Sequence, residues 1–159
     1  VNRLPADVTL TLYGDATVFP EYTAALRAAA RHPGIRFAGP LSYDAVGAAL
    51  RQLDYLVTPS LWCETFAMVV QEAEAVGTPV VASRIGALTR IQDGVTGRLF
   101  APGDAADLTR VLEDLYRHPA LRDHYRRNLS PGALLPEQAA RLVEIYREIL
   151  ARRNGERAV

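Results

Sequence analysis

The sequence predicts an α/β protein with a doubly wound, Rossmann-like parallel sheet that carries helices on both faces. Short, mostly apolar segments alternate with segments of helical length over the first 100 residues, which is typical of repeated βαβ units. Parallel strands of this kind are covered by helices on both sides. Right-handed crossovers between such units then produce a doubly wound sheet.

Five strands are expected in this pattern. The segment 8–13 is rich in β-branched residues and ends at Gly14-Asp15, which indicates a strand followed by a turn. The other expected strands are shorter apolar segments, several of them closed by Gly or Pro. They are residues 35–38, 54–58, 80–83 and 97–100.

The helices are expected between and after these strands. Pro20 suits the first position of a helix over 20–31, and Ser42 or Asp44 can cap a helix that runs to about residue 51. Thr65 can cap a helix over 66–76, which Gly77 ends. The remaining expected helices are 87–92, 104–117, 120–128 and 136–153.

A chain of 159 residues is long enough for one domain with a proper core, assigned to residues 1–159. The C-terminal helix, 136–153, carries an apolar stripe at helical spacing. This stripe either packs against the domain's own sheet or docks on a partner domain outside the chain. Its residues are Ala139, Leu142, Val143, Tyr146, Ile149 and Leu150.

Composition excludes several classes of partner. Eighteen basic residues balance eighteen acidic ones, which argues against nucleic acid as a partner because phosphate binding needs clustered positive charge. The apolar segments are too short to span a bilayer. Cys63 is the single cysteine, so no internal disulfide can form and a reducing, cytoplasmic location fits best. The three histidines, at 32, 118 and 124, lack metal-ligand spacing and are expected at the surface.

Two carboxylates, Glu64 and Glu72, lie around the start of the helix that follows the strand 54–58. Open α/β sheets bind ligands where the carboxyl end of a strand leads into a helix N-terminus. An ionised carboxylate only accepts hydrogen bonds and can take two side by side. A ribose diol or the vicinal hydroxyls of a hexose offer such a pair, so the pattern favours a nucleotide-sugar. Alternatively, both acids are solvated, with Glu74 completing a surface patch.

Backbone amides near these acids add a second kind of recognition. The amides of Phe66, Ala67 and Met68 would be unpaired donors in the first turn of the expected helix. Together with the helix dipole, they favour a phosphate or sugar oxygen at that position. The amides would therefore bind donor oxygens, one glutamate would bind the ribose, and the other would bind the sugar.

The segment from Pro59 to Gly97 resembles the C-terminal, donor-binding domain of retaining, nucleotide-sugar-dependent glycosyltransferases of the group 1 family, which have the GT-B fold. That family has a Pro-Ser turn, two Glu residues separated by seven positions, Gly-Thr-Pro-Val-Val-Ala, a Gly pair and Asp-Gly-x-x-Gly. The resemblance extends over about two-thirds of the chain, from Val8 to about Leu115. The matching residues are Glu64, Glu72, Ala73, 77–82, Gly86, Asp93, Gly94 and Gly97.

The resemblance implies a role for several residues of the chain. Glu64 would contact hydroxyls of the donor sugar at the catalytic centre, and Glu72 would bind the nucleotide ribose. Leu41 would lie beside the nucleobase, and Gly14 would let the chain pass close to the site. The other donor-binding residues that it implies are Thr65, Phe66, Ala67 and Met68, the last three through their amides.

The chain departs from the family at several points. Ala67 and Ala87 occupy positions where the family usually has Gly, and Ala16 replaces the second Gly of Gly-Asp-Gly. The family's donor domain also begins with a strand and a helix before the position of Val8, and that segment carries the basic residues that hold the donor pyrophosphate. Because a first strand is central in a doubly wound sheet, its absence should leave unpaired strand edges.

These features predict the donor-binding half of an enzyme that transfers a sugar from a nucleotide-diphosphate sugar to an acceptor. The acceptor site would lie on a missing N-terminal domain, which alone could give peripheral membrane association. The isolated chain should therefore bind donor weakly and transfer nothing. No cofactor is expected beyond the nucleotide-sugar substrate, and no metal, because no Asp-x-Asp pair is present. The alternative is a non-catalytic nucleotide-, sugar- or protein-binding module with the same fold.

Overall fold

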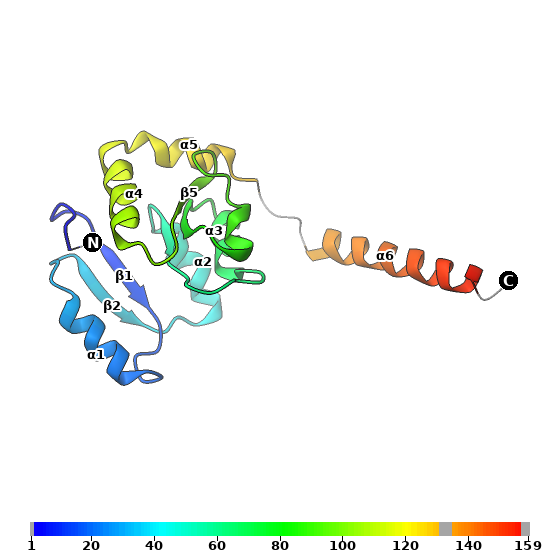
Figure 1. Cartoon of the computed structure of the whole chain (residues 1–159), viewed down its shortest axis with the longest axis horizontal. Coiled ribbons are helices and arrows are strands. Elements are labelled where there is room, and N and C mark those ends of the chain that lie inside the picture. Colours follow the sequence, from blue (N-terminus) through cyan, green and yellow to red (C-terminus); the bar gives the residue numbers. More distant parts are fainter. Residues whose placement is uncertain (1, 131–134, 157–159) are drawn as a thin grey trace.

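A computed structural model describes residues 2–130 and 135–156, with side chains described over 2–130 and 139–152. Strands and helices alternate along the first 100 residues, and helices follow (Figure 1). In chain order the elements are β1 (Leu10–Tyr13), α1 (Pro20–Ala29), β2 (Ile35–Gly39), α2 (Tyr43–Arg51), β3 (Leu56–Thr58), α3 (Met68–Ala75), β4 (Val80–Ser83), the 3-10 helix η1 (Gly86–Arg90), β5 (Gly97–Phe100), α4 (Ala105–Arg117), α5 (Ala120–Asn128) and α6 (Leu135–Glu156).

All strand pairs are parallel, and helices cover the strands, so the predicted fold class is confirmed. The strands form two sheets, however, with the orders β1-β2 and β3-β4-β5. Within the described residues, β1 and β3 each pair on one side only. The expected unpaired edges are therefore present, and they occur at the interruption between the two sheets.

The core lies on both faces of the β3-β4-β5 sheet. Val80 and Ala82 of β4 face one side, where they pack with α2, α3 and η1. Val81 faces the other side and packs with Phe100 and with residues of α4 and α5. All four residues of β4 are buried, as expected for the central strand of a covered parallel sheet.

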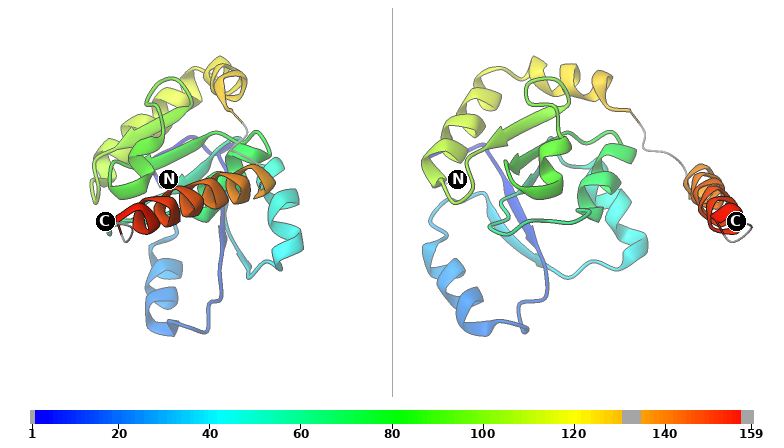
Figure 2. Two further views of the ribbon diagram at one scale, coloured as in Figure 1. Left: turned by 90° about the vertical axis from the view of Figure 1, so that its right-hand side faces the viewer. Right: turned by 45° about the vertical axis from the view of Figure 1, so that its right-hand side comes forward.

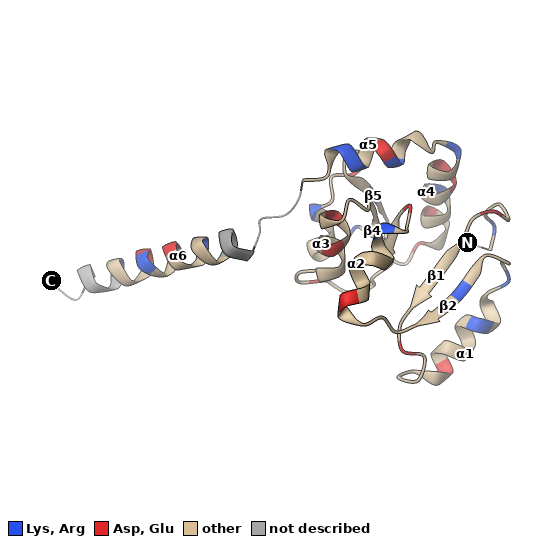
Figure 3. Cartoon of the chain, turned by 180° about the vertical axis from the view of Figure 1, so that it is seen from behind, with Lys and Arg blue, Asp and Glu red and all other residues tan. Residues whose placement is uncertain are grey.

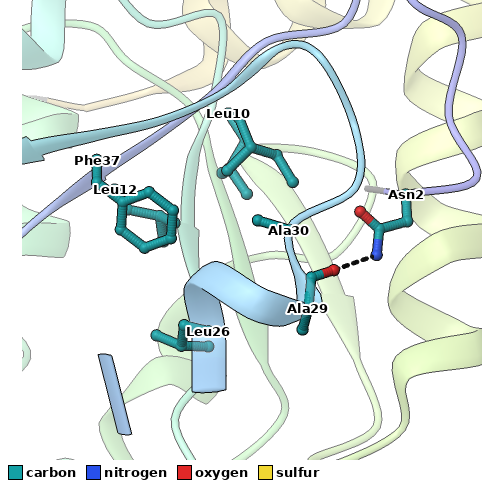
Figure 4. Close-up of a pocket in the computed structure, with 8 residues that line it drawn as sticks. Asn2, Leu10, Leu12, Leu26, Ala29, Ala30 and Phe37 are labelled. Atoms are coloured by element: carbon teal, nitrogen blue, oxygen red, sulfur yellow. Dashed lines mark hydrogen bonds between the residues drawn. The ribbon is translucent and has the colours of Figure 1, made fainter. Parts of the chain in front are cut away.

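The unit formed by β1, α1 and β2 has a much weaker interior. None of the residues in its two strands or its helix is fully buried. Its apolar side chains leave a pocket of about 230 Å³ between strands and helix, lined among others by Leu10, Leu26 and Phe37 (Figure 4). Polar contacts from the N-terminus stabilise the unit instead. Asn2 donates its side-chain N–H to Ala29 O at 2.8 Å and accepts from the amide of Arg31 at 3.0 Å.

His32 adds to these contacts with the N-terminal residues, and the expectation that it lies at the surface is wrong. The side chain is 7% exposed. Its Nδ1 accepts from the amide of Gly34 at 3.0 Å, so Nε2 carries the proton and donates to the carbonyls of Leu4 (3.2 Å) and Pro5 (3.0 Å). The imidazole is buried because both of its nitrogens have backbone partners. The other two histidines, at 118 and 124, are exposed as expected.

The C-terminal helix α6 does not pack on the sheet, so that alternative is wrong. Figure 1 and the right-hand view of Figure 2 show α6 set apart from the other elements. The large apolar side chains of its stripe, among them Leu142, Tyr146 and Ile149, are exposed. The physical reason is that both faces of the β3-β4-β5 sheet are already covered, by α2 and α3 on one side and by α4 and α5 on the other.

Charged residues of both signs are interspersed over the surface. Figure 3 shows acidic and basic residues alternating along α4, α5 and α6. Several form ion pairs within or between elements, such as Arg98 with Asp114 at 2.6 Å. Among the described residues, no helix has the length and apolarity required to cross a bilayer.

Two glycines near β5 provide a first prediction. A Cβ on Gly97 would lie 2.2 Å from Val80 O, because β5 passes very close to β4 there. A Cβ on Gly94 would meet no atom within 4 Å, although its φ of +80° is left-handed. We expect Gly97→Ala to lower the free energy of unfolding by about 3 kcal/mol or more. Gly94→Ala should cost only about 1–2 kcal/mol, the strain of the left-handed backbone.

Urea denaturation of the two variants, monitored by circular dichroism, would test this difference. Equal losses for Gly94→Ala and Gly97→Ala would contradict the close approach of β5 to β4.

The buried hydroxyl of Tyr55 leads us to expect a loss of stability at alkaline pH. Burial raises the pKa of Tyr55 to about 12, and the neighbouring Tyr125 acts in the same direction. Its buried hydroxyl has no hydrogen-bond partner among the described residues. The folded state thus favours the neutral phenol, so this contribution is complete below about pH 10, the unfolded pKa, and is lost as the pH rises towards the folded pKa.

We therefore expect the urea midpoint to fall between about pH 10 and about pH 12, and to fall less in Tyr55→Phe than in the unchanged chain. Identical pH dependence of the two proteins would contradict the assignment to Tyr55.

Candidate functional site

The loop 59–67, which joins β3 to α3, holds Glu64 at its base. Ser60 Oγ donates to Glu64 Oε1 at 2.9 Å. Both residues are half-buried, whereas Leu61, Trp62 and Cys63 between them are exposed. The loop therefore folds back on itself, and the Ser60–Glu64 hydrogen bond closes that fold.

The backbone of Glu64 is held from the opposite side by the start of η1. The amide of Ala87 donates to Glu64 O at 2.9 Å. Gly86, with a φ of +53°, approaches so closely that a Cβ would lie 2.8 Å from Glu64 O and 2.9 Å from Glu64 N. Glycine is thus required for two reasons, the left-handed φ and the lack of space.

Sequence reasoning did not assign functional roles to Ser60 and Gly86. Both belong to recognisable motifs, the Pro-Ser turn and the Gly pair, but nothing in the pattern shows that they meet at the same glutamate. Only the fold brings the loop after β3 and the start of η1 into contact.

The helix after Glu64 begins later than expected. Its first residue is Met68, and Ala67 occupies the N-cap position with left-handed φ and ψ of 52° and 62°. The expectation that Thr65 caps a helix from Phe66 is therefore wrong, since a left-handed residue interrupts the helical run. Among the described residues, Ala67 is the only non-glycine with positive φ.

This start changes which amides are available for a ligand. The amide of Val70 already donates to Ala67 O at 3.0 Å. The amides of Met68 and Val69 are the first two of the helix and have no intrahelical acceptor. Of the predicted first-turn donors, Met68 keeps its place, whereas Phe66 and Ala67 lie in the approach to the helix.

Glu72 lies just over one turn into α3 and is half-buried. Within the described part of the chain, its carboxylate forms no hydrogen bond or ion pair. Glu74, two residues on, is ion-paired with Arg90 at 2.7 Å. Burial raises the pKa of Glu74, and Arg90 opposes that rise. The two acids therefore have different environments, and they do not form a uniform solvated patch.

Leu41 is brought towards this site by the packing of α2 on α3. It lies two residues before the first residue of α2 and is 37% exposed. Near the C-terminal ends of the two helices, Thr78 Oγ1 donates to Leu50 O at 2.8 Å. Because α2 and α3 run side by side with these ends together, their N-termini lie at the same end of the domain.

Gly14 follows β1 and belongs to the other sheet. Its amide donates to Gly39 O at 3.0 Å, which places it close to the segment before Leu41. The predicted site residues thus fall into two groups, one on the β1-β2 sheet and one on the loop and helix after β3. No hydrogen-bonded strand joins these groups within the described residues.

The Asp-Gly-x-x-Gly motif has a structural role. Asp93 Oδ1 accepts from the amide of Leu99 at 3.0 Å, and Oδ2 accepts from Arg84 at 2.8 Å. Partial burial acts to raise the pKa of Asp93, but the Leu99 amide, Arg84 and Arg98 outweigh it and lower the pKa. Arg84 is half exposed and paired with this aspartate, which agrees with its expected surface position.

Large apolar side chains surround Glu64 and the start of α3. Trp62 and Leu61 are about two-thirds exposed, and Phe66, Met68 and Val69 are exposed as well. Such a concentration on one loop and the start of the following helix is typical of a binding surface. Among the described residues, no three His, Cys, Asp or Glu side chains are grouped as a metal site requires.

Comparison with known proteins gives the family. The model of the family described as "Glycosyl transferases group 1" matches residues 1–118. The phosphatidyl-myo-inositol mannosyltransferase of Mycobacterium leprae is 41% identical over 92 residues, which cover 57% of this chain and 25% of that protein. A D-inositol 3-phosphate glycosyltransferase of Streptosporangium roseum is 34% identical over 125 residues, covering 74% of this chain and 28% of that protein.

Solved structures show the same fold. Anabaena HepE in complex with UDP-glucose is 25% identical with a TM-score of 0.73, covering 80% of this chain and 36% of that one. Sucrose-phosphate synthase of Thermosynechococcus elongatus is 22% identical with a TM-score of 0.76, covering 94% of this chain and 47% of that one. The matched segments span only 25% and 28% of the length of the two curated relatives named above. The family match covers most of the sequence, and the chain belongs to the group 1 glycosyltransferases.

Proposed function

We propose that this chain is the donor-binding half of a retaining glycosyltransferase that uses a nucleotide-diphosphate sugar. The observation that carries the proposal is the pair Glu64 and Glu72 at the start of α3, one fixed by its loop and the other without a partner in the described chain. Between them, the amides of Met68 and Val69 point out of the first turn of a helix. Carboxylates accept hydrogen bonds from hydroxyl groups, and helix amides donate hydrogen bonds to phosphate oxygens. The site can therefore bind both the hydroxyl groups and the phosphates of a nucleotide-diphosphate sugar.

Glu72 is assigned to the ribose and Glu64 to the sugar. Glu72 has both carboxylate oxygens free of protein partners within the described residues, as the two hydroxyls of a ribose require. Glu64 lies in the exposed loop and is the acid nearer to the catalytic centre in this proposal. The complex of HepE with UDP-glucose supports a nucleotide-sugar as the class of ligand.

The basic group that would hold the donor pyrophosphate is assigned to a part of the protein outside this chain. Arg84, which directly follows β4, has its guanidinium paired with Asp93. Transfer needs positive charge at the leaving phosphate. We therefore propose that the isolated chain binds the nucleotide-sugar weakly and is inactive. The acceptor domain and the basic group that holds the pyrophosphate would come from the rest of a longer polypeptide.

A non-catalytic nucleotide- or sugar-binding module remains the alternative. A transfer assay on the longer polypeptide, with a panel of nucleotide-sugars, separates the two. Binding without transfer or donor hydrolysis would favour the alternative.

The proposed role of Glu72 predicts the effect of a single substitution. Glu72→Gln should weaken nucleotide binding roughly tenfold or more, because a charged acceptor of two hydroxyl hydrogen bonds becomes a neutral amide. Isothermal titration of the longer polypeptide with UDP and GDP measures this. Glu74→Gln is the matched control and should leave affinity unchanged, since Glu74 faces Arg90. Equal losses in both variants would contradict the assignment.

The interruption between the sheets yields another prediction. We propose that a strand from outside this chain pairs with the free edges of β1 and β3 and joins the two sheets. A strand in that place would be parallel to both neighbours and apolar on both faces. In the longer polypeptide, amides of Leu10–Tyr13 and Leu56–Thr58 should exchange with deuterium much more slowly than in the isolated chain. Unchanged exchange at both strands would contradict it, and the amides of β4, already central, serve as the internal control.

A further inference from the structure

Glu64 is held at three points, and only one of its side-chain oxygens is committed. The Ala87 amide and the close approach of Gly86 hold its backbone. The Ser60 hydroxyl donates to Oε1 at 2.9 Å. No described residue donates to Oε2. The carboxylate is therefore fixed in direction, with one oxygen bound inside the loop and the other available.

We propose that Ser60 is a positioning residue, whose hydroxyl holds the Glu64 carboxylate so that Oε2 points towards the donor sugar and accepts from its hydroxyls. This inference rests on the proposed function and adds how the sugar is selected. Ser60 does not touch the donor in this scheme and acts only through Glu64.

The location of Ser60 favours this role over a purely structural one. The three residues between Ser60 and Glu64 are exposed, and Thr58, which precedes the loop, belongs to the edge strand β3. A hydrogen bond between two half-buried side chains of the same loop contributes only modestly to the stability of the fold, because it replaces hydrogen bonds to water. The same bond strongly restricts a glutamate side chain that otherwise has three rotatable bonds. Its main effect is therefore on where the carboxylate points.

The arrangement also distinguishes the two acids of the site. Glu72 has two free oxygens and can accept from a diol, whereas Glu64 has one oxygen already bound to Ser60. Recognition of the sugar by Glu64 is thus expected to use mainly Oε2, and not both oxygens side by side as at Glu72.

The test compares nucleotide-sugars with the bare nucleotides. In the longer polypeptide that contains this chain, isothermal titration would use UDP-glucose against UDP and GDP-mannose against GDP. Ser60→Ala should weaken the nucleotide-sugar about tenfold and leave the nucleotide unchanged. Ser60→Thr keeps the hydroxyl and should restore most of the loss. Thr109→Ala removes a hydroxyl that donates to Ala105 O on α4 and serves as the control for loss of a local hydrogen bond.

The outcomes separate this inference from the function on which it rests. If the unchanged protein binds no nucleotide-sugar, the proposed function fails and the inference fails with it. If the unchanged protein prefers the nucleotide-sugar and Ser60→Ala retains that preference, the function stands and the positioning role is wrong. Equal weakening of nucleotide and nucleotide-sugar, together with a lower melting temperature, would show a structural role and also overturn it.

Discussion

The structure depends on the complete burial of β4 between two layers of helices. Val80 and Ala82 anchor α2, α3 and η1 on one face, and Val81 anchors α4 and α5 on the other. Burial of this kind stabilises the folded state by roughly 25 cal/mol per Å² of apolar surface. Both core clusters contain residues of β4. Because β3 and β5 pair with β4, the loops at their carboxyl ends are placed relative to one rigid element. The site of Glu64 is one of those loops.

The sequence predicted the strands and most helices because their signals are local. β-Branched runs, Pro20 at a helix start and Gly77 at a helix end act within a few residues, and the structure places elements there. The later start of α3 was not predictable, since a left-handed Ala67 has no signature of its own. The burial of His32 depends on carbonyls almost thirty residues away. The exposure of α6 follows from faces that other helices had already covered.

The candidate site shows the same division. Glu64 and Glu72 were identifiable from their spacing and from the family resemblance. The partners that fix Glu64 were not, because Ser60 and Gly86 are 26 positions apart in sequence and meet only after β4 is in place. The motif Asp93-Gly94 was part of the resemblance, and in the structure its carboxylate accepts hydrogen bonds from the Leu99 amide and from Arg84. Motif membership therefore pointed to a candidate site without showing which contacts hold its residues in place.

The β1-α1-β2 unit is held by hydrogen bonds from Asn2, whereas the β3-β4-β5 sheet has a buried apolar core. This difference has a consequence for the cooperativity of unfolding and of ligand binding. The unit of β1, α1 and β2 has no fully buried residue in its strands or helix, so we expect it to open before the rest of the molecule unfolds. Gly14 and Leu41 belong to or border that unit, whereas Glu64 and Glu72 are attached to the tightly packed part. A ligand that contacts both groups of residues would link the weakly packed unit of β1, α1 and β2 to the well-packed β3-β4-β5 sheet. The cost of ordering the unit of β1, α1 and β2 then becomes part of the free energy of binding. A protein segment that orders this unit in advance would therefore increase the affinity for the ligand without contacting the ligand.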